Sequence, residues 1–376
     1  MGVEIKKVPA TGEQQGLNQQ YENKDNSGII QLQDLEKDHN KYVQTNTNNG
    51  NGILKTVTAN NWLKEASLKE TPKRLFGDFM FENELCIMFG DSNTGKSILA
   101  VQIADSISSE REFKPLVMEV KNNSILYLDC ELSDKQFEMR YSENGVFHYQ
   151  FSEKFLRSEI DAEKLIDSKE KTTFEEQLIK SIEQGIKENF TKLLIIDNLT
   201  YLSSENEKAK DALPLMKHLK GLKTKYNLSI LILGHTPKRD LTKPLSKNDL
   251  SGSKMLINFC DSAFAIGEST QGSSIRYLKQ IKVRNTSINY DKDNVIVFTI
   301  EKSTNFLKFE YMGFGSEQEH LKQISSEQKE KLDNEIIQLK KEKPHLQNTE
   351  IAKRLGTYRM KVWRALEEHK QESQDK

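Results

Sequence analysis

Residues 90–97, GDSNTGKS, have the spacing G-x-x-x-x-G-K-S, whose residue types bind phosphate. The glycines let backbone N–H groups turn inward around phosphate oxygens, and the dipole of a following helix adds to the attraction. In this pattern Lys96 reaches the β- and γ-phosphates of a nucleotide, and the Ser97 hydroxyl binds Mg²⁺. The alternative is a glycine-rich turn with an incidental lysine. The pattern predicts that ATP and Mg²⁺ are held by Gly90, Asp91, Ser92, Asn93, Thr94, Gly95, Lys96, Ser97 and Ile98.

A carboxylate that can serve the same ion ends the apolar run KLLIID at residues 192–197. In an open sheet of parallel strands, the carboxyl ends of the strands point into the crevice where ligands bind. We therefore predict that Asp197 holds the Mg²⁺ shell through water. A strand-end aspartate taken alone is as often a turn residue or a helix cap, so this prediction depends on the phosphate-binding pattern beside it.

Hydrolysis of ATP needs a further carboxylate that orients and polarises the attacking water. The residue after Asp197 is Asn198, which cannot accept a proton. The run SILYLDCE at residues 124–131 ends in Asp129 and Glu131, and a strand that follows the phosphate-loop helix can lie beside the loop strand. We predict that Glu131 is the catalytic base. The alternative is a surface or N-capping acid before a helix that begins near residue 134.

These residues must be positioned by a regular set of elements. Short apolar runs bounded by turn residues alternate with segments of helical periodicity between residues 84 and 235, which predicts a parallel sheet covered by helices on both faces. Four later runs lack long helices between them and are predicted to extend the sheet as antiparallel strands. Strands are expected over 84–89, 123–131, 192–198 and 228–235, then 261–268, 275–283, 294–301 and 305–312, and helices over 96–108, 134–144, 173–190 and 210–226.

The ends of the chain differ from this α/β region. Residues 1–52 are polar and rich in Asn and Gln, so they cannot offset the entropy of ordering and are predicted to form a disordered arm. The α/β domain is predicted to span residues 53–315. Residues 325–376 are strongly charged and helical, which predicts a separate small all-α domain.

Composition limits the class of protein. Among 376 residues, 55 Lys and Arg balance 56 Asp and Glu, for a formal net charge of −1, so global charge neither indicates a nucleic-acid coat nor excludes local basic patches. The 3 cysteines have no disulfide or metal-ligand spacing, which favours reduced thiols. Because no run approaches the roughly 18 apolar residues of a membrane helix, we expect a soluble cytoplasmic protein without membrane contacts.

Taken as a set, the motifs resemble the RecA-like ATPases, which share a strand-two glutamate, an aspartate without a following glutamate, and a polar residue ending strand four. The similarity is greatest to the hexameric plasmid replication helicases of the RepA type, and it covers about residues 60–311. The resemblance implies a ring, expected to be a hexamer. It also implies that His235, which ends the run LILGH, senses the γ-phosphate.

The same resemblance assigns roles to two groups of basic residues. QIKVRN is similar to a K-x-R element in which Lys282 and Arg284 reach the γ-phosphate of a neighbouring subunit. Residues two apart share one face of a strand, and a cation there stabilises transition-state charge; the alternative is two solvated basic side chains. The loop 236–254 corresponds to the channel lining of such rings, where single-stranded DNA would contact Lys238, Arg239, Lys243 and Lys247. A mobile charged loop without DNA contact is the alternative.

Residues 349–369, TEIAKRLGTYRMKVWRALEEH, have the pattern of a helix-turn-helix. Ala352 and Gly356 allow a close helix crossing, and duplex DNA would be contacted by Arg359, Lys361 and Arg364. A helical hairpin that contacts another protein is the alternative.

The sequence thus predicts a Mg²⁺-dependent ATPase acting on DNA, an oligomeric helicase or translocase in the replication or mobilisation of a plasmid or mobile element. An ATP-dependent DNA-binding regulator, and a recombination or repair mediator, remain as alternatives. A motor is favoured by the basic loop with Lys282 and Arg284, whereas a regulator is favoured by the C-terminal DNA-reading pattern.

Overall fold

The computed structural model describes residues 54–161, 173–198, 212–250, 254–323, 326–355, 357 and 359–374. The predicted arm of residues 1–52 lies outside this part of the chain. Contacts divide the chain into two units, Met1–Thr71 and Pro72–Lys376. The described part of the first unit contains α2 (Ala59–Ser67), which begins where the Thr58 hydroxyl accepts a hydrogen bond from the N–H of Asn61.

The second unit is built on a mixed sheet with mainly parallel strands, and among the described residues this sheet has nine strands. Neighbouring strands from β10 to β7 run parallel, whereas β11, β12 and β13 extend the sheet in antiparallel fashion. In spatial order the strands are β13 (Phe306–Gly315), β12 (Val295–Ser303), β11 (Ile275–Lys282), β10 (Ser262–Glu268), β3 (Leu85–Gly90), β9 (Ser229–His235), β8 (Leu193–Asp197), β4 (Ile125–Asp129) and β7 (Phe155–Ser158).

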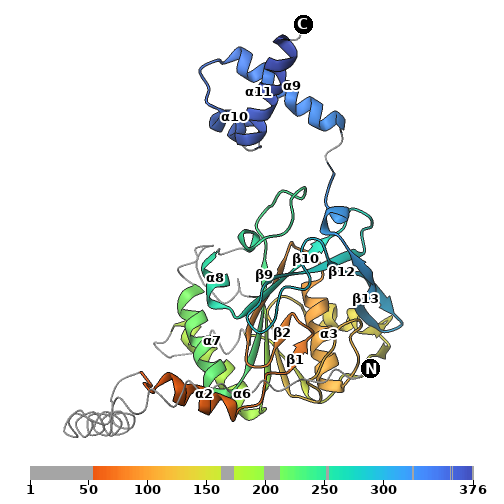
Figure 1. Cartoon of the computed structure of the whole chain (residues 1–376). Coiled ribbons are helices and arrows are strands. Elements are labelled where there is room, and N and C mark those ends of the chain that lie inside the picture. The colour runs from red at the N-terminus through yellow and green to blue at the C-terminus, as the bar shows by residue number, and fades with distance from the viewer. Residues whose placement is uncertain are drawn as a thin grey trace, which may run out of the picture. The chain divides into compact units, whose positions relative to one another are not determined.

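Helices cover both faces of this sheet (Figure 1). α3 (Lys96–Ser109) packs on one face, and α6 (Phe174–Glu188), α7 (Ala212–Tyr226) and α8 (Lys254–Phe259) pack on the other. Alternate residues of the central strand β3 enter the two apolar clusters, Ile87 on the α7 side and Met88 on the α3 side. A strand buried on both faces in this way is typical of a parallel sheet.

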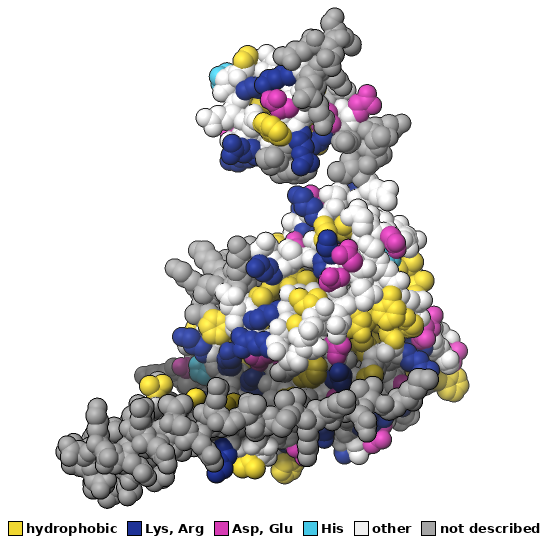
Figure 2. All heavy atoms as spheres, viewed as in Figure 1, with side chains coloured by type: hydrophobic (Ala, Val, Ile, Leu, Met, Phe, Trp, Pro, Cys, Tyr) yellow, Lys and Arg dark blue, Asp and Glu magenta, His cyan; other side chains and the backbone are white. Residues whose placement is uncertain are grey.

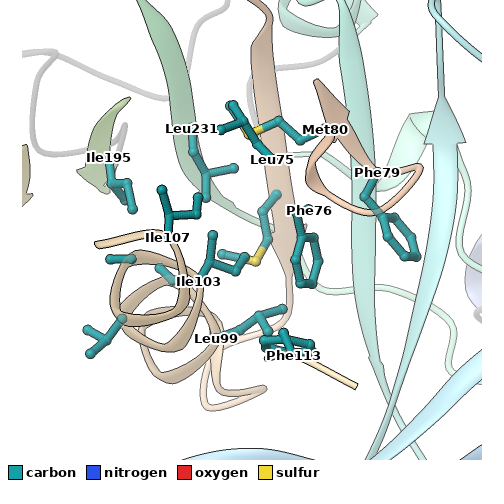
Figure 3. Packing of buried hydrophobic residues seen from close by; sticks show 14 of the residues in the cluster. Leu75, Phe76, Phe79, Met80, Leu99, Ile103, Ile107, Phe113, Ile195 and Leu231 are labelled. Carbon is teal, nitrogen blue, oxygen red and sulfur yellow. The ribbon is translucent and has the colours of Figure 1, made fainter. Parts of the chain in front are cut away.

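Figure 3 shows the cluster on the α3 side, where Leu99, Ile103 and Ile107 of the helix point toward the sheet. Phe76 and Phe79 close the same cluster from β1 (Arg74–Phe76) and the turn before β2 (Met80–Phe81). These side chains are almost completely buried. The packing fixes the start of α3, and with it the phosphate loop that precedes the helix.

The fold class predicted from the sequence, an α/β core with a mainly parallel sheet and antiparallel extension, is confirmed. Two details of strand arrangement were wrong. β4 does not lie beside β3, because β9 and β8 lie between them, and residues 261–268 form a strand parallel to β3. Alternation of strands and helices sets strand direction but leaves the spatial order open, and the short helix α8 is enough to make the crossover into β10.

The helix predicted over residues 134–144 ends earlier than expected. It is α4 (Asp134–Arg140), and it is followed by a hairpin of β5 (Ser142–Glu143) and β6 (Phe147–His148). Asn144 and Gly145 both have positive φ, 53° and 71°. An Asn-Gly pair in this conformation is the strongest short-range signal for a tight hairpin, and this competing turn ends the helix.

The described part of the C-terminal segment contains three helices, α9 (Ser326–Glu342), α10 (Asn348–Arg354) and α11 (Arg359–Gln374). They enclose an apolar cluster of their own, which includes Ile336, Ile351 and Val362. The predicted turn residue Gly356 lies outside the described residues, and the boundary near residues 315–325 stays a prediction. None of the described helices combines the length and hydropathy that crossing a membrane requires.

Candidate active site

The residues predicted to do chemistry meet at the carboxyl edge of the parallel strands. Gly90 at the end of β3 pairs in register with His235 at the end of β9, and Asp129 of β4 pairs with Asp197 of β8. The strands therefore bring the four positions to the same end of the sheet. This edge is where open α/β sheets bind their ligands.

The backbone of the phosphate loop hydrogen bonds to the side chain of its own lysine, Lys96. Gly95 has φ 93°, a left-handed conformation that favours glycine, and it caps the start of α3. The Lys96 ammonium donates hydrogen bonds to the carbonyls of Gly90 (3.0 Å) and Asp91 (2.8 Å). Burial lowers the pKa of Lys96, and the nearby charges of Asp197 and Glu131 oppose this effect. The cation is thus held at the loop, where phosphate oxygens can replace the two carbonyls.

Asp197 is buried behind the loop and accepts a hydrogen bond from the Tyr127 hydroxyl at 2.6 Å. Burial raises the pKa of Asp197 from 3.8 to about 6, against the effect of hydrogen bonds from Ser97 and Tyr127. A hydroxyl and a carboxylate in contact fit Mg²⁺, which takes oxygen ligands and leaves the remaining positions to phosphates and water. No cluster of three His, Cys, Asp or Glu side chains suited to a metal occurs in the described residues.

Glu131, Asn198 and His235 form one hydrogen-bonded group. The Asn198 amide nitrogen donates to Glu131 Oε1 and lies 2.8 Å from His235 Nε2. His235 Nε2 is also 3.2 Å from Glu131 Oε1. Although β4 does not adjoin β3, Glu131 still lies at the site, because β4 pairs with β8 at the level of Asp197. Asn198 therefore hydrogen bonds to the carboxylate that was predicted as the general base, a role that an amide side chain cannot take.

The surroundings of Glu131 favour its ionised form. The hydrogen bond with His235 lowers the pKa of Glu131, burial opposes this, and the charges of His235 and Lys96 lower the pKa further. A general base must be unprotonated at the working pH. Glu131 meets this requirement at neutral pH.

A cavity of about 330 Å³ is lined by the phosphate loop, Glu131 and His235. A larger cavity of about 610 Å³ lies between β4 and α6, and none of its lining residues belongs to the phosphate loop. Arg140, at the end of α4, lines the smaller cavity, although no motif in the sequence indicated it. The residues around the smaller cavity are Ser92, Asn93, Gly95, Lys96, Ser97, Ile98, Glu131, Leu132, Arg140 and His235.

The turn that carries Glu131 is held by an ion pair that the sequence reading did not include. One carboxylate oxygen of Asp129 accepts hydrogen bonds from the N–H groups of Glu131 (3.1 Å) and Leu132 (2.9 Å). Arg157 of β7 donates to the other oxygen at 3.0 Å and to the Leu132 carbonyl at 2.7 Å. Because β7 was not predicted as a strand, nothing in the sequence placed Arg157 beside this turn.

Lys282 and Arg284 lie at the opposite edge of the sheet, where the parallel strands begin. Lys282 ends β11, donating to the carbonyls of Ile257 and Cys260 at 2.6 Å each. Arg284, two residues beyond the strand, is half-exposed, with its guanidinium 3.2 Å from the Asp261 carboxylate.

This edge is remote from the phosphate loop of the same chain. The N–H of Asp261 bonds to the carbonyl of Leu85, the first residue of β3, whereas the phosphate loop begins at Gly90, the last. Six strand residues separate these edges by roughly 17 Å. Lys and Arg side chains also gather over α7 and α8 in Figure 2, and the charges of Arg284 and Lys220 contribute to lowering the pKa of Lys282, after burial.

The loop after β9 contains the cations predicted to meet single-stranded DNA. Lys238, Lys243 and Lys247 are exposed. The side chain of Arg239 is only 6% exposed, and its Nε lies 3.5 Å from the Asp91 carboxylate of the phosphate loop. An arginine turned toward the phosphate loop does not fit a direct DNA contact.

The same loop is anchored by Glu317, which is completely buried in a short 3-10 helix, η3 (Glu317–His320). The Leu245 N–H donates to Glu317 at 2.6 Å, and Lys279 of β11 pairs with the same carboxylate. The end of the loop is thus fixed to the sheet extension. In the C-terminal segment, Lys361 also points inward, to pair with Asp333 of α9, whereas Arg359 and Arg364 are exposed.

The part of the chain that contains the phosphate loop is similar to a known family. Residues 54–240 match the family model described as an AAA domain. Among solved structures, a KaiC-like protein, PH0186 from the hyperthermophilic archaeon Pyrococcus horikoshii OT3, is 13% identical with a TM-score of 0.44, covering 63% of this chain and 99% of that one. No curated protein matches. The match over residues 54–240, the phosphate loop and the mainly parallel sheet make this part of the chain similar to P-loop ATPase domains.

Proposed function

We propose that this protein is an ATPase that assembles into a ring, hydrolyses ATP at the contacts between subunits and acts on DNA as a helicase- or translocase-type motor. Replication or mobilisation of a plasmid or other mobile element is the role that we propose for it. The observation that carries the proposal is the separation of Glu131 from Lys282 and Arg284, which lie at opposite edges of one sheet.

The hydrolytic step follows from the groups around the cavity. Water attacks the γ-phosphorus, its proton passes to the Glu131 carboxylate, and the bond from the γ-phosphorus to the bridging oxygen breaks to leave ADP and phosphate. Lys96 binds the phosphate oxygens, and Asn198 holds Glu131 in place. Mg²⁺ at Ser97 and Asp197 would neutralise phosphate charge.

Cations from a neighbouring copy complete this site in the proposal. Charge develops on the γ-phosphate oxygens in the transition state, and an arginine supplied by a second subunit is worth several orders of magnitude in rate. Lys282 and Arg284 are too far from the phosphate loop of their own chain to act there. A head-to-tail contact that closes into a ring, here taken as a hexamer, brings one edge of each subunit to the other edge of the next.

DNA contacts are proposed at two places. Lys238, Lys243 and Lys247 follow the strand that ends at His235, so a change around the γ-phosphate can pass into the loop that holds single-stranded DNA. Arg359 and Arg364 on α11 would contact the phosphates or base edges of duplex DNA. The helical C-terminal cluster, with its own apolar core, also favours the second candidate, an ATP-dependent DNA-binding regulator.

One pair of assays separates the two candidates: ATPase rate with and without single-stranded DNA, and displacement of a labelled strand from a partial duplex. A motor gives DNA-stimulated hydrolysis and strand displacement. A regulator binds DNA without displacing a strand, and this result would contradict the proposal. Changing Lys238, Lys243 and Lys247 to Ala should abolish the stimulation, whereas the matched change of the exposed Lys217 and Lys225 on α7 should leave it intact.

A further inference from the structure

The phosphate loop is held from its outer side by an arginine of β11, Arg276. The Arg276 Nε donates a hydrogen bond to the carbonyl of Thr94 at 3.1 Å, and one terminal nitrogen donates to the carbonyl of Asn93 at 3.4 Å. The residue is only 7% exposed. It comes from a strand about 180 positions later in the sequence, so no local pattern indicates the contact.

The other donors of the guanidinium are also used. The second terminal nitrogen donates to the carbonyls of Ser273 (2.8 Å) and Ile275 (2.9 Å), and Glu268 lies 3.4 Å from the first. Burial lowers the pKa of Arg276, and the charge of Glu268 opposes this. A buried cation is costly unless its donors are paired, and here backbone carbonyls, two of them in the phosphate loop, pair with it.

Because the peptide bond is planar, the contacts of Arg276 with the two carbonyls also set the direction of the N–H groups in the loop. A trans peptide points its C=O and the next N–H in opposite directions. When Arg276 holds the carbonyls of Asn93 and Thr94 outward, the N–H groups of Thr94 and Gly95 are directed inward. The Thr94 N–H donates a hydrogen bond to the Asp91 carbonyl at 3.4 Å, the same carbonyl that the Lys96 ammonium contacts, so this N–H and the lysine face one side of the loop. Inward N–H groups are the ones that bind phosphate.

Packing on the same outer side supports this arrangement. A Cβ atom added to Gly95 would lie 2.7 Å from Ile300 of β12 and 3.0 Å from Phe309 of β13. The loop therefore rests against side chains of the antiparallel extension, with Arg276 beside them. The extension does not belong to the parallel core, but it forms the surface against which the loop is held.

We propose that Arg276 is a positioning residue for nucleotide binding, which keeps the Thr94 and Gly95 N–H groups directed at the phosphates. The inference rests on the proposed ATP-binding function. Arg276→Ala should raise both the Kd and the KM for ATP by about 10- to 100-fold, the effect of two charge-assisted hydrogen bonds. The change in kcat should be smaller, since Glu131 is untouched. Arg276→Lys, which keeps the charge and one donor nitrogen, should recover part of the affinity.

The test measures Kd for fluorescent ATP and ADP analogues, KM and kcat, and thermal unfolding without nucleotide. Arg111→Ala is the matched control, because Arg111 donates to the buried Asp105 at 2.8 Å and its loss weakens the fold away from the loop. Should Arg276→Ala fail to fold, Arg276→Lys and Arg276→Met are measured in the same way.

Weaker binding in the Arg276 variants, with the Arg111 variant binding ATP like wild type, supports the proposal. Unchanged affinity in the Arg276 variants, or an equal loss in the Arg111 variant, would overturn it. Failure of the wild-type protein to bind ATP is a different outcome, since it contradicts the proposed function itself.

Discussion

The amide of Asn198 hydrogen bonds to Glu131, so the residue after Asp197 contacts the carboxylate that we propose as the base. The pair comes from two neighbouring strands, β8 and β4, whose ends are in register. In the proposed function, this arrangement supplies a carboxylate to the site without a glutamate directly after Asp197. It also makes the role of each residue separable by mutation.

Glu131→Gln should lower kcat for ATP hydrolysis by about 10²- to 10⁴-fold, because an amide cannot take the proton of the attacking water. ATP binding should persist, since Lys96 and the loop are unchanged. The measurement is steady-state hydrolysis beside the Kd for ATP. Glu143→Gln, at the exposed position of β5, is the control, and hydrolysis that survives Glu131→Gln would assign the base to another group.

Asp197 gives a pH-dependent prediction. Its pKa in the folded protein is about 6, above its unfolded value, so the protonated form is favoured by folding. Stability from this group is fully present below pH 3.8 and is lost as pH rises through 6, an effect of about 3 kcal/mol. Asp197→Asn should therefore stabilise the nucleotide-free protein at about pH 8 and leave it unchanged below about pH 4.

Chemical denaturation at the two pH values measures this difference, and Asp129→Asn is the comparison at the neighbouring strand end, where Arg157 already pairs with the charge. The Asp197→Asn variant should also lose Mg²⁺-dependent hydrolysis. Equal stability of wild type and variant at the higher pH would contradict the buried, protonation-sensitive carboxylate.

Residue types alone were sufficient to predict that the phosphate loop, Asp197 and Glu131 lie at one end of a parallel sheet, since these residues end apolar runs, whereas their chemical roles stay predictions. Arg140, Arg157 and Arg276 could not be predicted. Each of these arginines reaches the site from an element whose position depends on the strand order or on a turn. A short stretch of sequence does not predict either of these features. The contact between Arg239 and Asp91 of the phosphate loop could not be predicted for the same reason.

Among the elements, β7 has the clearest effect on the position of a proposed catalytic residue, although it is a short edge strand. Its Arg157 fixes Asp129 and the carbonyl of Leu132, and these two hold the turn on which Glu131 stands. The strand was missed because four half-buried residues do not form an apolar run. Its contribution is to position a side chain and not to enlarge the core.

Arg157→Ala should lower kcat by about 10-fold or more while the Kd for ATP changes little, because misplacement of a catalytic group by a fraction of an ångström affects the transition state first. Arg157→Lys should recover part of the rate. The split between kcat and Kd is the diagnostic readout. A proportional loss of both would show that β7 supports the fold in general and not the turn with Glu131.

At the scale of the molecule, alternation of strands and helices was enough to predict the layers and the parallel direction of the core. The order β10-β3-β9-β8-β4 was not predictable, because each crossover can span a variable number of strand positions. That order has a functional consequence. It leaves one edge with the ATP site and the opposite edge with Lys282 and Arg284, so a single chain has both halves of the proposed site but cannot join them.

The most direct test of the shared site is ATP hydrolysis by mixtures of Glu131→Gln and Arg284→Ala subunits. Each variant alone should be inactive, whereas a mixed ring contains contacts that pair an intact Glu131 with an intact Arg284 of the neighbour. Mixing either variant with the double variant is the control. We predict that only the mixture of the two single variants regains activity. If Arg284→Ala subunits hydrolyse ATP at the wild-type rate, or if the mixture stays as inactive as its components, the shared site is contradicted.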